Sequence, residues 1–221
     1  MKRPLPFWAT ALLLALHQAA FAQVACSSEG QPTPTALLER FTSADCEACW
    51  TDAHAALPGP GAVVLDWIVP GALGDEAPLS AAARQDSLNR LQSLGRATQP
   101  TTPRQSLPLR VARGPALGGY IGTSIALEAQ EGPYGPLTAW LALVETIPAG
   151  TEGSAVERNL VRNTLVLDWS MAGEHKEIRP LSVPAGAQAA RLRVIGWVED
   201  ASLQVVAVAQ SVCANTDENP Q

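Results

Sequence analysis

The hydrophobic pattern of the first 118 residues alternates between strand-like and helix-like segments. Residues 62–69 are almost continuously apolar, as expected of a strand that is covered on both faces, and residues 35–42 predict a first buried strand. Residues 49–57 predict a short helix that ends at a Pro-Gly-Pro-Gly run. Residues 78–97 predict the longest helix, because an approximate spacing of three to four positions relates Leu79, Ala83, Leu88, Leu91 and Leu94. Alternating strands and helices are typical of an α/β arrangement.

After residue 118 the pattern changes to a series of strand-like runs separated by turn residues. Some of these runs alternate apolar and polar positions, as half-buried antiparallel strands do. The segment 98–118 is expected to be a loop with one or two short strands. The strand-like runs cover residues 121–129, 138–145, 160–169, 189–199 and 203–211.

A Cys-x-x-Cys motif, Cys46-Glu47-Ala48-Cys49, lies between the first predicted strand and the first predicted helix. This placement is typical of the thioredoxin-type redox arrangement. The two sulfurs share one face of a helical turn, and the first lies near free N–H groups that favour a thiolate, the nucleophile of disulfide exchange. The expected fold class is α/β, with a thioredoxin-like domain at 23–118, a mostly β extension at 119–213 packed on it, and a tail at 214–221.

The N-terminal 22 residues have the pattern of a secretory signal peptide. A positively charged start precedes the apolar residues 5–16, and Ala20-Phe21-Ala22 matches an Ala-x-Ala cleavage site. We expect a periplasmic or secreted bacterial protein without membrane association after cleavage. The alternatives are an uncleaved membrane anchor and a lipoprotein modified at Cys26.

The charge of the chain is acidic. The formal net charge is −6, and it becomes −8 without the two basic residues of the signal segment. Nucleic acids and anionic lipids attract basic surfaces, so neither is an expected partner.

All four cysteines lie beyond the predicted cleavage site, and disulfides persist outside the cytoplasm. Of the three possible pairings, Cys46–Cys49 with Cys26–Cys213 is the most economical. The second bond would close a very long loop and stabilise the protein by roughly 4–5 kcal/mol in the chain-entropy treatment.

The segment Phe41-Thr42-Ser43-Ala44-Asp45-Cys46-Glu47-Ala48-Cys49 resembles the Phe-Thr-Ser-x-x-Cys-x-x-Cys signature of a secreted, thioredoxin-like proteobacterial family of unknown function. Departures include Trp50-Thr51 where members usually have Pro-Pro. The resemblance implies a thioredoxin-like fold and says little about activity. Weaker similarities are found at Leu65-Asp66-Trp67, Thr102-Pro103-Arg104-Gln105, Glu157 to Asn163 and Val194 to Asp200.

The expected redox roles follow from the order of the two cysteines. Cys46 is the expected attacking thiol because it is N-terminal and should be more exposed, and Cys49 is the expected resolving thiol. Asp45 and Glu47 flank Cys46, and nearby carboxylates oppose thiolate formation. The sequence therefore predicts a reduction potential nearer to about −270 mV, as in thioredoxin, than to about −120 mV, as in a strong periplasmic oxidant.

Three further residues are candidates for the site. Glu39, on the strand before the motif, could relay a proton to Cys49, or it could be a solvated strand residue that pairs with a base such as Arg40. Asp66 on the next strand has the same two interpretations. The thioredoxin-like resemblance implies a cis-proline that faces the disulfide, with Pro103 as the candidate. The alternative is an ordinary loop proline.

The leading functional hypothesis is a thiol–disulfide oxidoreductase that acts on protein thiols or disulfides, uses an unidentified redox partner and needs no cofactor. The alternative is a non-catalytic binding or scaffolding module with a structural disulfide. A metal set of Cys46, Cys49 and His54, completed by Cys26 or Cys213, is disfavoured, because no second Cys-x-x-Cys exists and His54 would lie on another part of the helix. No metal site is therefore assigned.

Overall fold

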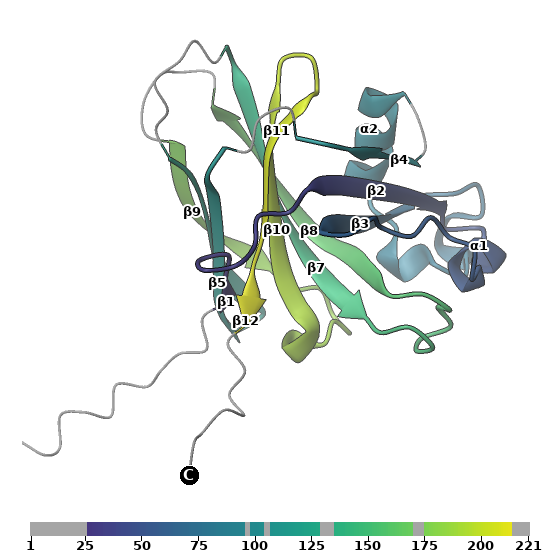
Figure 1. The fold of residues 1–221 in the computed structure, drawn as a ribbon. Helices are drawn as coiled ribbons and strands as arrows, with labels where there is room; N and C mark the ends of the chain where they lie inside the picture. Colours follow the sequence, from purple (N-terminus) through teal and green to yellow (C-terminus); the bar gives the residue numbers. More distant parts are fainter. Residues whose placement is uncertain (1–25, 96–97, 104–106, 129–134, 170–174, 214–221) are drawn as a thin grey trace, which may run out of the picture.

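The computed structural model describes residues 26–95, 98–103, 107–128, 135–169 and 175–213. These residues form two β-sheets, two α-helices and three 3-10 helices (Figure 1). The helices are α1 (Glu47–Thr51), α2 (Gln85–Leu94), η1 (Gly74–Glu76), η2 (Ser80–Ala82) and η3 (Ala189–Arg191). The strands are β1 (Cys26–Ser27), β2 (Ala36–Ser43), β3 (Ala62–Val69), β4 (Thr98–Thr101), β5 (Leu109–Leu117), β6 (Tyr120–Leu127), β7 (Leu137–Ile147), β8 (Arg158–Trp169), β9 (His175–Ser182), β10 (Leu192–Asp200), β11 (Val205–Gln210) and β12 (Val212–Cys213).

The larger sheet has seven strands in the order β11-β10-β7-β8-β3-β2-β4 and curls into a nearly closed, barrel-like form. β2, β3 and β8 run parallel, and the other neighbours are antiparallel. The junction between the two halves of the chain is the pairing of β3 with β8, where Asp66 lies opposite Leu160. In Figure 1, β2 and β3 lie beside β8 and cross the direction of β10.

Strands β7 and β10 are buried on both faces. Alternate β7 residues such as Leu141 and Leu143 belong to the core between the two sheets, whereas Ala142 and Val144 belong to the core inside the barrel-like curl. This double burial explains why the strands are nearly continuously apolar although they are antiparallel.

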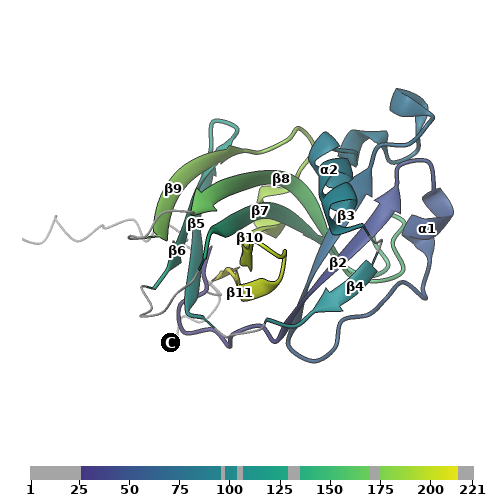
Figure 2. The same cartoon turned by 90° about the horizontal axis from the view of Figure 1, so that it is seen from above.

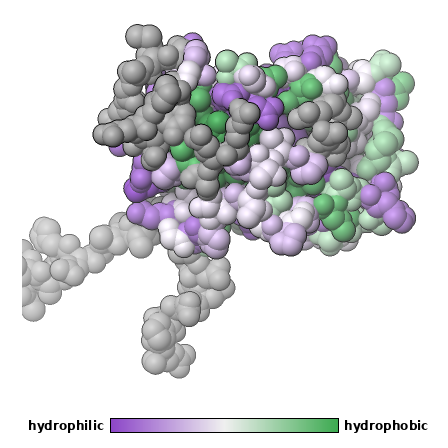
Figure 3. Space-filling model, turned by 45° about the horizontal axis from the view of Figure 1, so that its top comes forward, coloured by the Kyte–Doolittle hydropathy of each residue, from purple (hydrophilic) through white to green (hydrophobic). Residues whose placement is uncertain are grey.

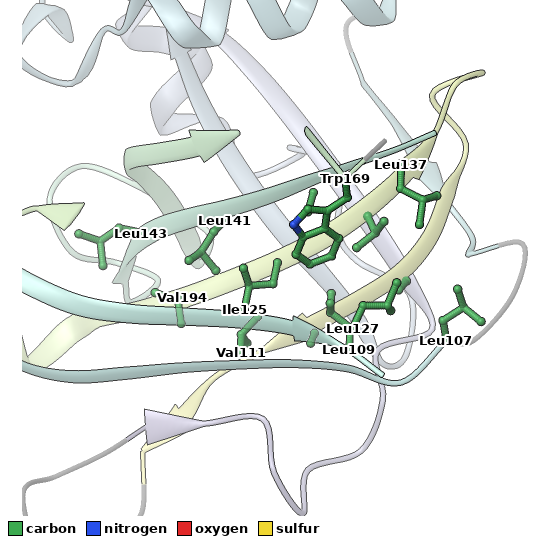
Figure 4. Close-up of a cluster of buried hydrophobic side chains, with 14 of the residues drawn as sticks. Leu107, Leu109, Val111, Ile125, Leu127, Leu137, Leu141, Leu143, Trp169 and Val194 are labelled. Carbon is green, nitrogen blue, oxygen red and sulfur yellow. The ribbon is translucent and has the colours of Figure 1, made fainter. Parts of the chain in front are cut away.

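The smaller sheet, in the order β12-β1-β5-β6-β9, packs against the outer face of β7, β10 and β11. Figure 4 shows Val111 and Ile125 of this sheet facing Leu141 and Val194 of the larger one. The sheets approach closely at Gly196, where an added Cβ would lie only 2.6 Å from Val111 Cγ1. A residue without a side chain is therefore required at this crossing.

The helices α1 and α2 lie around β2 and β3, on the side of the molecule away from β9 (Figure 2). The indole of Trp50 from α1 packs with Ile68, Ala77 and Leu160 in a separate small core. On the face shown in Figure 3, hydrophobic and hydrophilic residues are intermixed. No described helix is long and apolar enough to cross a membrane.

The expected thioredoxin-like fold class is wrong: the structure is mostly β and not thioredoxin-like. The reason lies after β4, where the chain does not extend the first sheet but enters the second sheet with β5 and β6. The next neighbour of β3 is β8, from far along the sequence. The expected division at residue 118 falls in the turn that joins β5 and β6, two strands of one hairpin.

Several element predictions also need correction, although β3 has the predicted bounds and β2 is shifted by one residue. The helix expected at 49–57 is the single turn α1, and the helix expected at 78–97 is reduced to α2 behind two 3-10 turns. The segment expected to be mainly loop contains the nine-residue strand β5. Strand β9 was not expected, because it starts with the charged residues His175-Lys176-Glu177 and exposes most of its side chains.

Candidate redox site at Cys46 and Cys49

The Cys-x-x-Cys motif occupies the turn that joins β2 to α1, and its two cysteines form a disulfide. Cys46 caps the N-terminus of α1, and the Cys49 backbone N–H donates to Cys46 Sγ at 3.2 Å. The disulfide therefore closes a single helical turn, the small ring expected from sulfurs three positions apart.

The two cysteines differ in exposure, in the opposite sense to the expectation. Cys46 is half-buried and Cys49 is exposed. Cys49 also lines an open hollow with a volume of about 550 Å³, together with Arg40, Asp52, His54, Ala56 and Arg158 among others. The more accessible member of the pair is therefore the second cysteine rather than the first.

A buried ionic cluster lies beneath α1. The guanidinium of Arg40 donates to both carboxylate oxygens of Asp66, at 2.8 and 2.7 Å, and Arg158 donates to Asp66 Oδ1 at 3.1 Å. All three side chains are at most 5% exposed. Two guanidiniums and one carboxylate leave a formal charge of +1. We call Arg40, Asp66 and Arg158 the cationic cluster.

Arg158 connects the cationic cluster to the disulfide. Its Nη2 donates to the carbonyl oxygens of Trp50 at 3.0 Å and Cys49 at 3.4 Å, and its guanidinium lies 5.0 Å from the centre of the Trp50 ring. Arg40 in turn donates to the Ala56 carbonyl at 3.1 Å. The cluster thus holds both the short helix and the loop that follows it.

Asp45, expected to oppose a thiolate at Cys46, is engaged elsewhere. Its carboxylate accepts the backbone N–H groups of Ala72, at 2.7 Å, and Leu73, at 3.2 Å. Gly71 passes so close that an added Cβ would lie 2.1 Å from Asp45 Oδ1. Asp45 therefore anchors the loop after β3, and these hydrogen bonds disperse part of its negative charge.

The proposed relay role of Glu39 is wrong, because Glu39 and Arg40 point to opposite faces of β2. Arg40 belongs to the cluster beneath the disulfide, whereas Glu39 points into the barrel-like curl. There Glu39 receives Trp67 Nε1–H at 3.0 Å and the guanidinium of Arg90 at 2.6 and 3.0 Å.

Arg90 also binds a second buried carboxylate, that of Glu199, which in turn accepts Trp197 Nε1–H at 3.1 Å. Burial raises the pKa of Glu39, opposed by Arg90 and assisted by the charge of Glu199. Burial lowers the pKa of Arg90, but hydrogen bonds and charges of the two carboxylates outweigh it and raise that pKa above its ordinary value. One guanidinium between two carboxylates leaves a formal charge of −1, and we call Glu39, Arg90 and Glu199 the anionic cluster.

Pro103 does not face the disulfide, and the described residues contain no cis peptide bond. It follows β4, whose last residue Thr101 pairs with Leu37 near the start of β2, whereas Cys46 follows the end of β2. The length of β2 therefore separates the two sites by about 20 Å. Pro103 is an ordinary loop proline.

The alternative metal set is not assembled. All four cysteines are in disulfides, and no group of three or more metal-ligating side chains occurs in the described part of the chain. His54 instead lies beside Asp52, whose Oδ1 accepts the His54 backbone N–H at 2.8 Å and is 3.3 Å from Nδ1. This backbone hydrogen bond is the main reason that the pKa of Asp52 is lowered.

The second disulfide joins Cys26 to Cys213, the pairing favoured by the cysteine positions. It links the two-residue strands β1 and β12 of the smaller sheet, in which Cys26 and Cys213 lie directly opposite each other. Cys26 is fully buried and Cys213 half-buried.

Sequence reasoning missed Arg158 and assigned no site role to Arg40. A signal was present, because Arg40 lies within a predicted buried strand and a buried arginine needs a partner. Asp66 stands in the same situation on the adjacent predicted strand. The pairing of these two could have been proposed, whereas Arg158 comes from a distant segment that only the β3–β8 pairing brings close.

No family model matches the chain, and no curated protein matches it. Among solved structures, HBP35 of Porphyromonas gingivalis is similar with a TM-score of 0.50 and 10% identity, over 87% of this chain and 80% of that one. Protein AGR_C_4864 from Agrobacterium tumefaciens is similar with a TM-score of 0.44 and 14% identity, over 86% of this chain and 100% of that one. At these identities the likeness to HBP35 concerns the fold alone.

Proposed function

We propose that the protein exchanges disulfides with other proteins through Cys46 and Cys49, outside the cytoplasm. The observation that carries the proposal is an exposed Cys49, disulfide-bonded to Cys46, at the edge of an open hollow. Exchange requires a thiolate to reach one sulfur of the bond. Two disulfides in one chain support an oxidising compartment.

The geometry favours Cys49 as the cysteine that bonds to a partner. A partner thiolate that attacks Cys49 Sγ forms a mixed disulfide there and breaks the Cys46–Cys49 bond. The bonding electron pair leaves with Cys46, whose sulfur already accepts the Cys49 backbone N–H. A second thiolate of the partner then attacks the partner's own sulfur in the mixed disulfide, so the partner leaves as a disulfide, Cys49 keeps the bonding electron pair, and Cys46 and Cys49 remain as a dithiol. This assignment reverses the roles expected from the sequence.

The cationic cluster supports thiolate formation at this turn. Positive charge near a thiol favours its ionised form, and a low dielectric strengthens the effect. The charge acts through the carbonyls of Cys49 and Trp50 rather than on the sulfur, so its influence should be modest.

Trapping of the mixed disulfide tests the proposal. Cys46→Ser should retain a protein or glutathione partner on Cys49, whereas the matched Cys49→Ser variant should retain much less on half-buried Cys46. Mass mapping of non-reduced peptides measures how much partner is bound to the remaining cysteine in each variant. A Cys46–Cys49 bond that resists reduction until below about −300 mV, or opens only when the chain unfolds, would identify a structural bond instead.

A binding module with a static Cys46–Cys49 bond is the second candidate function. It is supported by another hollow of about 500 Å³ on the outer face of the smaller sheet, floored by Ala112, Ser124 and Ala126. The trapping experiment separates the two candidates, because a binding module requires no mixed disulfide. The specific support for membership of the secreted family is the motif Phe41 to Cys49. Membership stays a proposal, and the thioredoxin-like fold is no longer part of it.

A further inference from the structure

The guanidinium of Arg113 on β5 is buried without a carboxylate partner in the described residues. The residue is 7% exposed. Its Nη1 donates to the Gly114 carbonyl at 3.1 Å, its Nη2 donates to Cys213 Sγ at 3.2 Å, and its Nε has no partner. Buried arginines are normally paired, because a charge removed from water without a counter-ion is costly.

The charged surroundings of Arg113 increase this cost. Burial is the main reason that the pKa of Arg113 is lowered, and the charge of Arg193 on β10 adds to it. Asp217 and Glu218 of the C-terminal segment lie outside the described residues, so the test below includes them.

Three side chains form one row across the edge of the smaller sheet. Cys26 of β1 lies opposite Arg113 of β5 on one side and opposite Cys213 of the edge strand β12 on the other. Arg113 reaches across β1 to the sulfur of Cys213. In the described residues, the side-chain atom that accepts a hydrogen bond from Arg113 is this disulfide sulfur, which is uncharged and a weak acceptor.

We propose that Cys26–Cys213 is a reducible disulfide and that its reduced form carries a reactive thiolate at Cys213, paired with Arg113. The reductant is a dithiol, which gives up two electrons and two protons and becomes a disulfide. Cys26 takes one proton, Cys213 keeps the negative charge, and the other proton goes to solvent. The ion pair exists only after reduction, so it shifts the equilibrium toward the reduced form.

Reduction would also free the two short strands that the bond holds. β1 and β12 pair with each other over only two residues, and β12 lies at the edge of its sheet. Cys213 is half-buried and becomes accessible to electrophiles such as glutathione disulfide once this bond is open. The inference concerns a different disulfide and does not depend on the activity proposed for Cys46 and Cys49.

The test compares Arg113→Met with Arg110→Met in the full chain. Arg110 lies on the same strand, has a 60% exposed side chain and pairs with Glu128, so its loss controls for removal of a positive charge. Titration with dithiothreitol, followed by labelling of thiols and mass mapping, reports Cys26–Cys213 separately from Cys46–Cys49. We expect the equilibrium constant for reduction of Cys26–Cys213 to fall about tenfold in Arg113→Met, which corresponds to about 30 mV, and to stay unchanged in Arg110→Met.

A second readout follows the alkylation rate of reduced Cys213 at pH 6, where a paired thiolate should react about tenfold faster in wild type than in Arg113→Met. Arg113→Lys, which keeps the charge, should restore most of the rate. Arg113→Gln, which is neutral and polar, replaces the methionine variant if that variant unfolds. Both differences should persist after Asp217→Asn and Glu218→Gln. Equal reduction constants and rates in folded wild type, Arg113→Met and Arg113→Lys would overturn the proposal, as would differences that vanish in the changed tail.

Discussion

Adjacent residues of β2, Glu39 and Arg40, start two buried ionic clusters of opposite charge. The anionic cluster lies inside the barrel-like curl with two tryptophans, and the cationic cluster lies outside it beneath the disulfide turn. Successive side chains of a strand point to opposite faces, so one strand supplies both. The comparison separates a cluster that closes the fold from a cluster that supports the candidate site.

The composition of each cluster explains its role. Arg90 of α2 joins Glu39 of β2 to Glu199 of β10, so the anionic cluster links a helix to two strands that are distant in the sheet. Arg158 and Arg40 instead donate to carbonyls of α1 and its following loop. Loss of the anionic cluster should therefore have the larger effect on global stability. Loss of the cationic cluster should also change the reactivity of Cys46 and Cys49.

The largest effect is expected for Arg90→Met. The change leaves two buried carboxylates without a counter-ion and should lower the free energy of unfolding by about 3–5 kcal/mol, measured by urea denaturation at pH 7. Arg179→Met, with a 54% exposed arginine side chain, should change it by less than about 1 kcal/mol. Adding Glu39→Gln and Glu199→Gln should recover part of the loss. Equal small effects of both arginine changes would contradict the central role of Arg90.

A smaller loss, about 3 kcal/mol, is expected for Asp66→Asn. This change removes the carboxylate that joins Arg40 to Arg158, although carbonyl groups continue to accept hydrogen bonds from both arginines. The same variant should increase the reactivity of Cys49 after reduction, because the net positive charge rises. A variant that is destabilised but alters no thiol rate would limit the cationic cluster to a structural role.

The third effect is a pH dependence of stability from Glu39. Its pKa is raised in the folded state above the ordinary value of 4.5, mainly by burial, so the folded state binds the proton more tightly. This contribution is complete below pH 4.5 and is lost as the pH rises through the folded pKa, by at most about 1.4 kcal/mol per pH unit. In Glu39→Gln the decline should be absent, whereas exposed Glu76→Gln should leave it unchanged. Urea denaturation at several pH values from 4.5 to 8 measures the free energy of unfolding of wild type and both variants. A decline that persists in Glu39→Gln would contradict the prediction.

The sequence contains enough local information for β2, β3 and the disulfide turn, and too little for the closure of the larger sheet. A strand buried on both faces is apolar at nearly every position, so its pattern does not show which strands lie beside it. The pairing of β3 with β8, in which Asp66 lies opposite Leu160, could therefore not be predicted from the pattern. The placement of Glu39 depends on that closure, because Arg90, which binds Glu39, also binds Glu199 of β10. Strand β9 escaped prediction for a different reason, since an exposed edge strand needs few apolar residues.

The exposure of the two cysteines also lay beyond sequence reasoning. The expectation that Cys46 is the accessible thiol relied on its N-terminal position in the motif, whereas α1 ends at Thr51 and Cys49 lies beside the hollow. The Phe-Thr-Ser-x-x-Cys-x-x-Cys resemblance identified the local turn but not the fold around it. A motif of nine residues specifies local geometry, whereas the fold depends on contacts between distant strands.

The smallest effect tests whether the cationic cluster influences the sulfurs at all. Arg158→Gln keeps a hydrogen-bond donor for the Cys49 and Trp50 carbonyls and removes one positive charge. Because the charge acts through the backbone, we expect only about a threefold fall in the equilibrium constant for reduction of Cys46–Cys49. Arg84→Gln, a partly exposed arginine that donates to the Arg162 carbonyl and Asp86, is the matched control and should cause no change. A fall that is equal in both variants would mean that general charge, rather than the cluster beneath α1, sets the reduction equilibrium. No change in either would leave the cationic cluster as a clamp for the turn, with the position of Cys49 as its contribution to exchange.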